Sequence, residues 1–250
     1  MLEPAWLGHP DPHIRDALVY PTLATWMASG VFSVGQTRTV LGRLLDGNHL
    51  FFRLAEVGGE SVLVRSFAAL QIAAILGRHL RHPFLTAAEV HGLVPVLLRY
   101  LESEKDLRGY DVSLGWLHAA AHTADAMSNL ARCGELGSAE LHRVLGGLRF
   151  MVGCEFHAYT DGEDERLATA MSHALSQPKL APDERLSWLD GFREQVQTCA
   201  ELGMPASYVR FMNIKHTLRA LYFVILSTPG EAERLLNQRI EQLLHEFAEL

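Results

Sequence analysis

Apolar residues recur at helical spacing along the whole chain, and helix-cap signals accompany them. Thr86 and Glu89 have the spacing of a capping box, and Thr228 is followed by Pro229, at the first helical position that proline favours. Strand-like alternation bounded by turns is nearly absent. We therefore predict an all-α fold. The expected helices are residues 12–29, 34–47, 60–80, 86–103, 113–132, 138–152, 162–176, 183–200, 206–226 and 230–249.

About ten helices joined by short loops indicate either a stack of helical hairpins or a closed bundle. Two His-Pro pairs, at residues 9–10 and 82–83, each precede a helix with a proline, Pro21 or Pro95. This offset of 73 or 74 residues is about twice the usual HEAT or armadillo period. It favours a HEAT- or armadillo-like stack, an α-solenoid or compact α–α superhelix, although chance similarity among helices rich in Leu and Ala gives the same pattern. No linker marks a boundary, so we expect one domain over residues 1–250.

The overall composition excludes several classes of partner. The chain has 29 acidic and 22 basic residues, and its arginines are scattered singly, whereas a nucleic-acid-binding protein needs a clustered basic face. Three separated cysteines, Cys133, Cys154 and Cys199, fit a reducing compartment better than a disulfide framework. The sequence has no signal-peptide pattern and no apolar run long enough to span a membrane. We expect a cytoplasmic protein with no nucleic-acid or membrane partner.

One segment departs from the average composition. Residues 112–131 contain a single charged side chain, Asp125, where the chain's 20% charge density would give about four. A helix without a charged face is usually buried on most of its sides. We therefore expect the helix at residues 113–132 to lie inside the protein, with its few polar groups paired, because each unpaired buried polar group costs about 1–3 kcal/mol.

The polar residues of this helix fall on one side. With about 3.6 residues per turn, His118, His122, Asp125 and Asn129 lie within one narrow stripe. Three interpretations remain open: a structural hydrogen-bond network, a pocket for a small polar ligand or a peptide terminus, and a metal site. Two histidines at i and i+4 with a carboxylate at i+7 can supply metal ligands from one helix face, here His118, His122 and Asp125. The metalloprotease motif H-E-x-x-H is not met, because Ala119 replaces its glutamate.

A second polar cluster runs from Glu155 to Arg166 and includes Glu163 and Asp164, with a helix start near Asp161. Acidic residues in a first helical turn are explained by the helix dipole and by capping. In the functional alternative, these side chains face the histidine stripe and complete a ligand site or an ionic network. Arg108, which immediately precedes the unusual helix, is another candidate partner of the stripe.

The same segments carry a resemblance. The run from Gly115 and Trp116 through His118 and His122 to Asp125 is similar to the G-W-x-H-x-x-A-H-x-x-D signature of an uncharacterised bacterial family, a domain of unknown function. The E-D-E-R-L run that starts at Glu163 resembles a later element of that family. The resemblance is specific over about 60 residues. It implies a cytoplasmic bacterial helical protein whose polar positions are those named above, and it supplies no activity.

Other catalytic signatures are missing from the sequence. There is no G-x-S-x-G elbow, no phosphate-binding G-x-x-x-x-G-K-[ST] loop and no dinucleotide-binding G-x-G-x-x-G after a strand. We therefore expect a helical binding module for an unknown small molecule, peptide or protein. A metal-dependent hydrolase that uses His118, His122 and Asp125 with a divalent metal is the alternative, and a purely structural polar network is a second one. Apart from that metal, no cofactor is assigned.

Overall fold

The computed structural model describes residues 4–249 and is 68% helical, which confirms the all-α fold. The chain divides into two compact units, one ending at Leu136 and one beginning at Gly137. The single domain over residues 1–250 and its HEAT-like stacking stay predictions.

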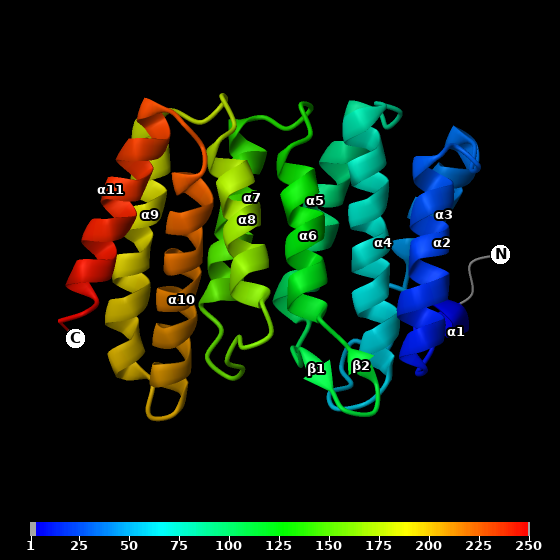
Figure 1. The fold of residues 1–250 in the computed structure, drawn as a ribbon, viewed down its shortest axis with the longest axis horizontal. Coiled ribbons are helices and arrows are strands. Elements are labelled where there is room, and N and C mark those ends of the chain that lie inside the picture. The colour runs from blue at the N-terminus through cyan, green and yellow to red at the C-terminus, as the bar shows by residue number, and fades with distance from the viewer. Residues whose placement is uncertain (1–3, 250) are drawn as a thin grey trace. The chain divides into compact units, whose positions relative to one another are not determined.

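The first unit contains six α-helices, one π-helix and a small two-stranded sheet within its described residues. They are α1 (Pro4–Leu7), the π-helix (His13–Val19), α2 (Tyr20–Ala28), α3 (Val34–Leu44), α4 (Ser61–Arg81), α5 (Ala87–Ser103), β1 (Tyr110–Asp111), β2 (Gly115–Trp116) and α6 (Ala119–Ala131). Helices α2, α4 and α6 pack side by side, while α3 packs on α4 and α5 packs on α6 (Figure 1). Helix α4 therefore lies at the centre of this unit.

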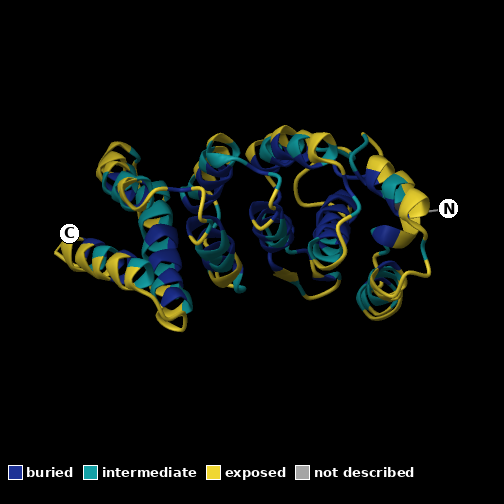
Figure 2. Cartoon of the chain, turned by 90° about the horizontal axis from the view of Figure 1, so that it is seen from above, coloured by how far each residue is buried: buried dark blue, intermediate teal, exposed yellow. Residues whose placement is uncertain are grey.

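The sequence of α4 explains its central place. Among residues 4–249 it is the one helix long and apolar enough to cross a membrane, but 83% of its apolar window is buried inside the protein. That burial is the property of a core helix. In Figure 2, exposed residues gather on the outer turns and on the loops of each unit, and buried residues line the inward helix faces. A cytoplasmic location stays a prediction.

Local signals place most helix ends where we expected them. The Thr86 hydroxyl accepts a hydrogen bond from the backbone N–H of Glu89, and the Glu89 carboxylate accepts one from the N–H of Thr86, which confirms the capping box. The helix expected at residues 12–29 begins as a π-helix and becomes α-helical at Tyr20. Pro21, which has no N–H to donate, is the second residue of the α-helical part.

The expected helix at residues 113–132 is wrong in its first six residues. Helix α6 begins only at Ala119, and β1 and β2 form an antiparallel pair ahead of it. The physical reason is a tight turn: the Asp111 carboxylate accepts hydrogen bonds from the N–H groups of Ser113 and Leu114 at 2.9 and 3.0 Å. Gly115 follows with a φ of 72°, in the left-handed region that favours glycine.

The second unit contains five α-helices and a short 3-10 helix within its described residues. They are α7 (Ser138–Val152), α8 (Glu163–Leu175), α9 (Pro182–Gln197), the 3-10 helix (Thr198–Glu201), α10 (Ala206–Leu226) and α11 (Glu231–Glu246). Helix α8 packs on α7 and α10, and α11 packs on α9 and α10. These helices agree with the expected ranges to within a few residues.

Candidate functional site

His118 lies outside the helical stripe to which we assigned it. It is the N-cap residue of α6 and has a left-handed backbone, with φ 50° and ψ 35°. Its ring stacks on the Trp116 ring at a centroid distance of 4.3 Å and meets the His122 ring edge-on at 5.7 Å. The hairpin therefore brings Trp116, His118 and His122 together, although helical spacing does not.

His122 is buried and hydrogen-bonds to α4. Its Nδ1 lies 2.7 Å from the Oγ of Ser66, and the Ser66 hydroxyl donates its hydrogen to the carbonyl oxygen of Leu117. Since a hydroxyl has one hydrogen, Ser66 Oγ accepts from the Nδ1–H of His122. This is the reverse of the polarity that a serine nucleophile needs, where the histidine accepts the serine proton. The hydrogen bonds of Ser66 to His122 and to Leu117 therefore join α4 to the start of α6.

Arg15, which the sequence analysis did not single out, fixes the hairpin from the other side. Its side chain is fully buried, and its guanidinium donates to the carbonyl oxygens of Leu114 at 2.6 Å and His9 at 2.8 Å. It also pairs with the Asp16 carboxylate at 2.8 Å. Burial raises the pKa of Asp16, although the charges of Arg15 and His118 act in the opposite direction. These contacts hold the hairpin to the π-helix.

Arg108 belongs to a structural ion pair rather than to the histidine group. Its guanidinium donates to both oxygens of Asp106, at 2.8 and 2.7 Å, and to the carbonyl oxygen of Gly59 at 2.7 Å. Burial would raise the pKa of the Asp106 carboxyl, but the hydrogen bonds from Arg108 and from the N–H of Gly58 outweigh it, so that the pKa lies below its usual value. These contacts bind the loop before α4 to the segment between α5 and β1.

A second ion pair close to Asp106 is fully buried. Arg65 on α4 donates to both carboxylate oxygens of Glu104, at 2.6 and 2.8 Å, and the Tyr100 hydroxyl donates to Glu104 at 3.1 Å. The N–H of Asp106 donates to the same carboxylate at 3.0 Å. The two charges therefore have most of their hydrogen-bonding capacity filled, as a buried pair requires. Patterns along the sequence do not indicate this pair, because its members are 39 residues apart.

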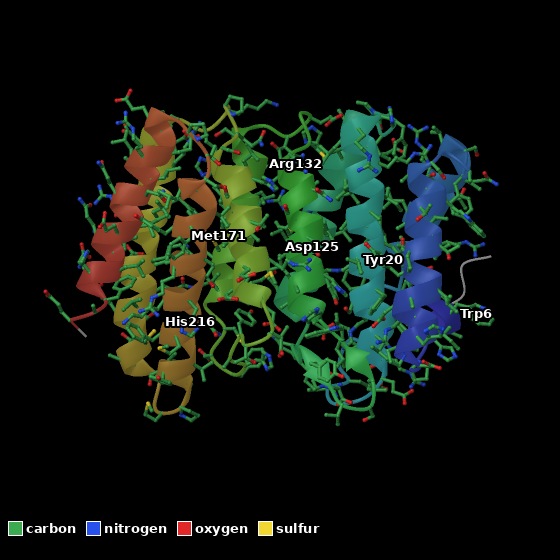
Figure 3. The ribbon with its side chains drawn as sticks, in the orientation of Figure 1. Trp6, Tyr20, Asp125, Arg132, Met171 and His216 are labelled. Atoms are coloured by element: carbon green, nitrogen blue, oxygen red, sulfur yellow. The ribbon has the colours of Figure 1, made fainter. Side chains whose placement is uncertain are left out.

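Asp125 and Asn129, the other half of the predicted stripe, line a cavity of about 460 Å³. We call it the α6 cavity, and α2, α4 and α6 form its walls (Asp125 and Tyr20 are labelled in Figure 3). Alanines of α2 and α4 are among its lining residues. Its polar and small residues include Tyr20, Gly77, Arg81, Asp125, Ser128 and Asn129. The Asn129 amide donates to the carbonyl oxygen of Ala73 at 2.9 Å, which fixes the amide against α4.

Arg81 brings an unpaired cation to the α6 cavity. Among residues 4–249, its guanidinium has no hydrogen-bond or ion-pair partner. A Cβ placed on Gly77 would lie 3.4 Å from the Asn129 amide nitrogen and 3.8 Å from a guanidinium nitrogen of Arg81. The Asn129 amide and the Arg81 guanidinium therefore both lie close to the α-carbon of Gly77. Because glycine has no side chain, the space between these two donors is not filled.

The described residues contain one group of potential metal ligands, His79, Cys133 and Glu135, whose ligating atoms lie within 4.8 Å of one another. None of His118, His122 and Asp125 belongs to it, and metal binding by those three stays a prediction.

The hydrogen bonds of this group do not suit a metal. His79 Nδ1 accepts from the N–H groups of Phe84 and Leu85 at 3.0 and 3.1 Å, so its ring proton is on Nε2, 3.1 Å from Glu135. A metal-bound imidazole normally donates through its other nitrogen, which is the opposite arrangement. Burial also raises the pKa of the Cys133 thiol to about 12, whereas a metal needs the thiolate.

Glu163, Asp164 and Arg166 lie in the second unit, at the start of α8. Glu163 is fully buried, and one of its oxygens accepts from the N–H of Asp161 at 2.9 Å. Its other oxygen has no hydrogen-bond partner within residues 4–249. The Asp164 carboxylate accepts from the N–H of Glu165 at 3.0 Å. That these three residues complete a site with the stripe of the first unit stays a prediction.

Comparison with known proteins gives a family without an assigned activity. No curated protein and no solved structure matches the chain. A family model described as a protein of unknown function, DUF2785, matches residues 50–223, and this range includes every site residue from Arg108 to Arg166 named above. The expected resemblance to an uncharacterised family is thereby confirmed. Because the match covers more than half of the chain, the chain belongs to the DUF2785 family.

Proposed function

We propose that the protein is a binding module and that the α6 cavity holds a small polar ligand with a carboxylate group. The observation that carries the proposal is the unpaired Arg81 beside Asp125 and Asn129 in one cavity. The volume of about 460 Å³ falls in the range of small-molecule sites. The cavity walls are rigid helices, which suits a preformed site.

The side chains define the chemistry of the ligand. The forked donors of Arg81 fit a carboxylate, which can accept two parallel hydrogen bonds from one guanidinium. Asp125 supplies a carboxyl group on the facing helix and suits a ligand amine. The small residues Ala73, Ala74 and Gly77 leave room for the body of the ligand. A free amino acid or a short peptide terminus has both charged groups close together and is the class that these features favour.

The two halves of the predicted stripe then have different roles. His122 is held by Ser66 and His118 by the Trp116 ring, so the histidines build the hairpin and the start of α6. Asp125 and Asn129, further along the same helix, line the cavity. The structural-network interpretation therefore fits His118 and His122, and the ligand-site interpretation fits Asp125 and Asn129.

Thermal unfolding with the twenty free amino acids as probes tests the proposal. We expect at least one of them to raise the Tm of the wild-type protein, because a ligand that binds the folded state stabilises it. The amide of that amino acid lacks the carboxylate and should give a much smaller rise. Arg81→Ala should remove the rise, while Arg234→Ala, which changes an exposed arginine of α11, should keep it.

A second pair of variants tests the location. Gly77→Leu places a bulky side chain in the α6 cavity and should abolish binding, whereas Gly77→Ala should reduce it only slightly. If no amino acid or short peptide changes the Tm, or if the rise persists in both Arg81→Ala and Gly77→Leu, the proposed site is wrong.

A further inference from the structure

The first unit has a second and larger cavity, which precedes the residues matched by the family. Its volume is about 900 Å³, and it is lined from α1, the π-helix, α2 and α3. We call it the N-terminal groove. Its apolar lining includes Trp6, Leu18, Leu23, Trp26, Phe32 and Val40. The α2 residues that line this groove differ from those that line the α6 cavity, so the two cavities are separate.

Large apolar side chains of this groove are exposed to solvent. Trp6 is 56% exposed, Leu18 is 50% exposed and Trp26 is 45% exposed (Trp6 is labelled in Figure 3). The Trp26 ring packs edge-on against Phe32 at 6.0 Å, so the groove has an ordered wall. Adjoining exposed apolar residues of this size mark a binding surface, since water contact is unfavourable for them.

Arg43 is the one charged residue that lines the groove within the described chain. It has no hydrogen-bond or ion-pair partner among residues 4–249. Two neutral polar residues of the lining are already used internally, because Gln36 accepts from the N–H of Ser33 and the Thr39 hydroxyl donates to the carbonyl oxygen of Gly35. Arg43 lies in the last turn of α3, where the helix dipole favours a cation. The dipole does not explain why this cation also lines an apolar cavity.

We propose that the N-terminal groove binds a linear amphipathic carboxylic acid, with its acyl chain against Trp6 and Trp26 and its carboxylate on Arg43. An apolar cavity with one orienting charge is the usual design of a small-molecule site, and about 900 Å³ lies within the range of such sites. The positive charge of Arg43 favours an anionic head group over a neutral or a cationic one. This proposal is independent of the α6 cavity, because it uses other residues and another ligand.

Tryptophan fluorescence gives a direct test, because two of the four tryptophans line the groove. The probe is dodecanoate with bromine on its terminal carbon, used below its micelle concentration, which quenches an indole that it contacts. We expect saturable quenching, and competition by unlabelled dodecanoate at least fivefold stronger than by dodecanol or dodecyltrimethylammonium. Replacing both Trp6 and Trp26 by Phe should remove the saturable part and leave the signals of Trp116 and Trp188.

Charge variants identify the orienting group. Arg43→Ala should weaken dodecanoate binding about tenfold or more, because it removes a hydrogen bond to a charged group. Arg43→Lys should retain most of the binding, and Arg234→Ala should retain all of it. Leu18→Glu should abolish binding, and because Leu18 is half exposed, circular dichroism should show an intact helical fold.

Four results would overturn the proposal. Equal binding of dodecanol and dodecanoate, or an unchanged affinity in Arg43→Ala, would remove the role of the charge. Saturable quenching that survives the loss of Trp6 and Trp26 would place the probe elsewhere. A concentration-dependent dimer in sedimentation velocity that disappears in Leu18→Glu would show that a second copy of the chain covers the groove.

Discussion

The Nδ1 atom of His122 donates a hydrogen bond to the Oγ atom of Ser66, 2.7 Å away, and so joins α6 to α4. The Phe67 ring, next to Ser66 in the chain, meets the His122 ring edge-on at 5.1 Å. Arg15 lies over the same Phe67 ring, with its guanidinium carbon 5.0 Å from the ring centroid. The histidine is thus one part of a packed group that connects the π-helix, α4 and α6.

Ser66→Ala should lower the free energy of unfolding by about 1–3 kcal/mol. The variant leaves the Nδ1–H of His122 and the carbonyl oxygen of Leu117 without their partner, and each is buried. Urea unfolding followed by circular dichroism measures the change. Ser176→Ala, which removes an exposed hydroxyl in the second unit, is the matched control and should change the free energy by less than about 0.5 kcal/mol. Equal effects of the two substitutions would contradict the role assigned to Ser66.

Much of the helical fold can be predicted from the sequence, because helix signals are local. The capping box at Thr86 and Glu89 needs residues only three positions apart, and the structure contains it. The start of α6 depends on distant residues. Arg15 holds the hairpin through the carbonyl oxygens of Leu114 and Trp116, which lie 99 and 101 residues further along the chain. No periodicity within residues 112–131 contains that information.

In the candidate site, too, some features follow from local sequence and others depend on contacts between distant residues. A low local charge density led correctly to a buried segment, and Asp125 and Asn129 line a cavity on it. Arg81 gives no signal of its own in the sequence, because it is one arginine among many in a charged helix end. Its place beside Asn129 depends on how α4 packs against α6 across Gly77. Residues that meet through helix packing cannot be found from spacing along one helix.

Gly77→Ala should raise the free energy of unfolding by about 0.5–1 kcal/mol, because glycine inside a helix is less favourable than alanine by that amount. The added methyl group would meet its nearest neighbour, the Asn129 amide, at 3.4 Å, which is an ordinary contact. Urea unfolding of the two proteins measures the difference. Gly92→Ala on α5, where a methyl group would meet nothing within 4 Å, serves as the control for helix propensity alone. A loss of stability in Gly77→Ala but not in Gly92→Ala would show that the α6 cavity has no room for the added methyl group.

The Asp106 carboxyl should make the stability of the protein depend on acid pH. Its pKa in the folded protein lies below the ordinary value of 3.8, because the hydrogen bonds from Arg108 and Gly58 outweigh the effect of burial. A group with a lowered pKa contributes its stabilisation above the unfolded pKa and loses it as the pH falls through the folded pKa. Unfolding free energies between pH 6 and pH 3 should therefore fall more steeply for the wild-type protein than for Asp106→Asn.

At neutral pH, Asp106→Asn should be less stable than the wild-type protein, because the Arg108 guanidinium loses the closer of its two charged partners and keeps only Asp111 at 3.7 Å. The control is Asp183→Asn, which changes an exposed carboxylate in the first turn of α9. It should leave the pH profile close to that of the wild-type protein. Parallel profiles for the wild-type protein and Asp106→Asn would contradict the lowered pKa.

Cys133 should behave as an unreactive thiol and not as a zinc ligand. With a pKa of about 12, only about one thiol in ten thousand is ionised at pH 8. In a protein with Cys154→Ala and Cys199→Ala, a disulfide reagent should modify Cys133 slowly in the native state and rapidly in urea. Added Zn²⁺ should change neither that native rate nor the Tm. Rapid native modification that Zn²⁺ suppresses, together with a rise in Tm that Glu135→Gln abolishes, would instead make His79, Cys133 and Glu135 a metal site.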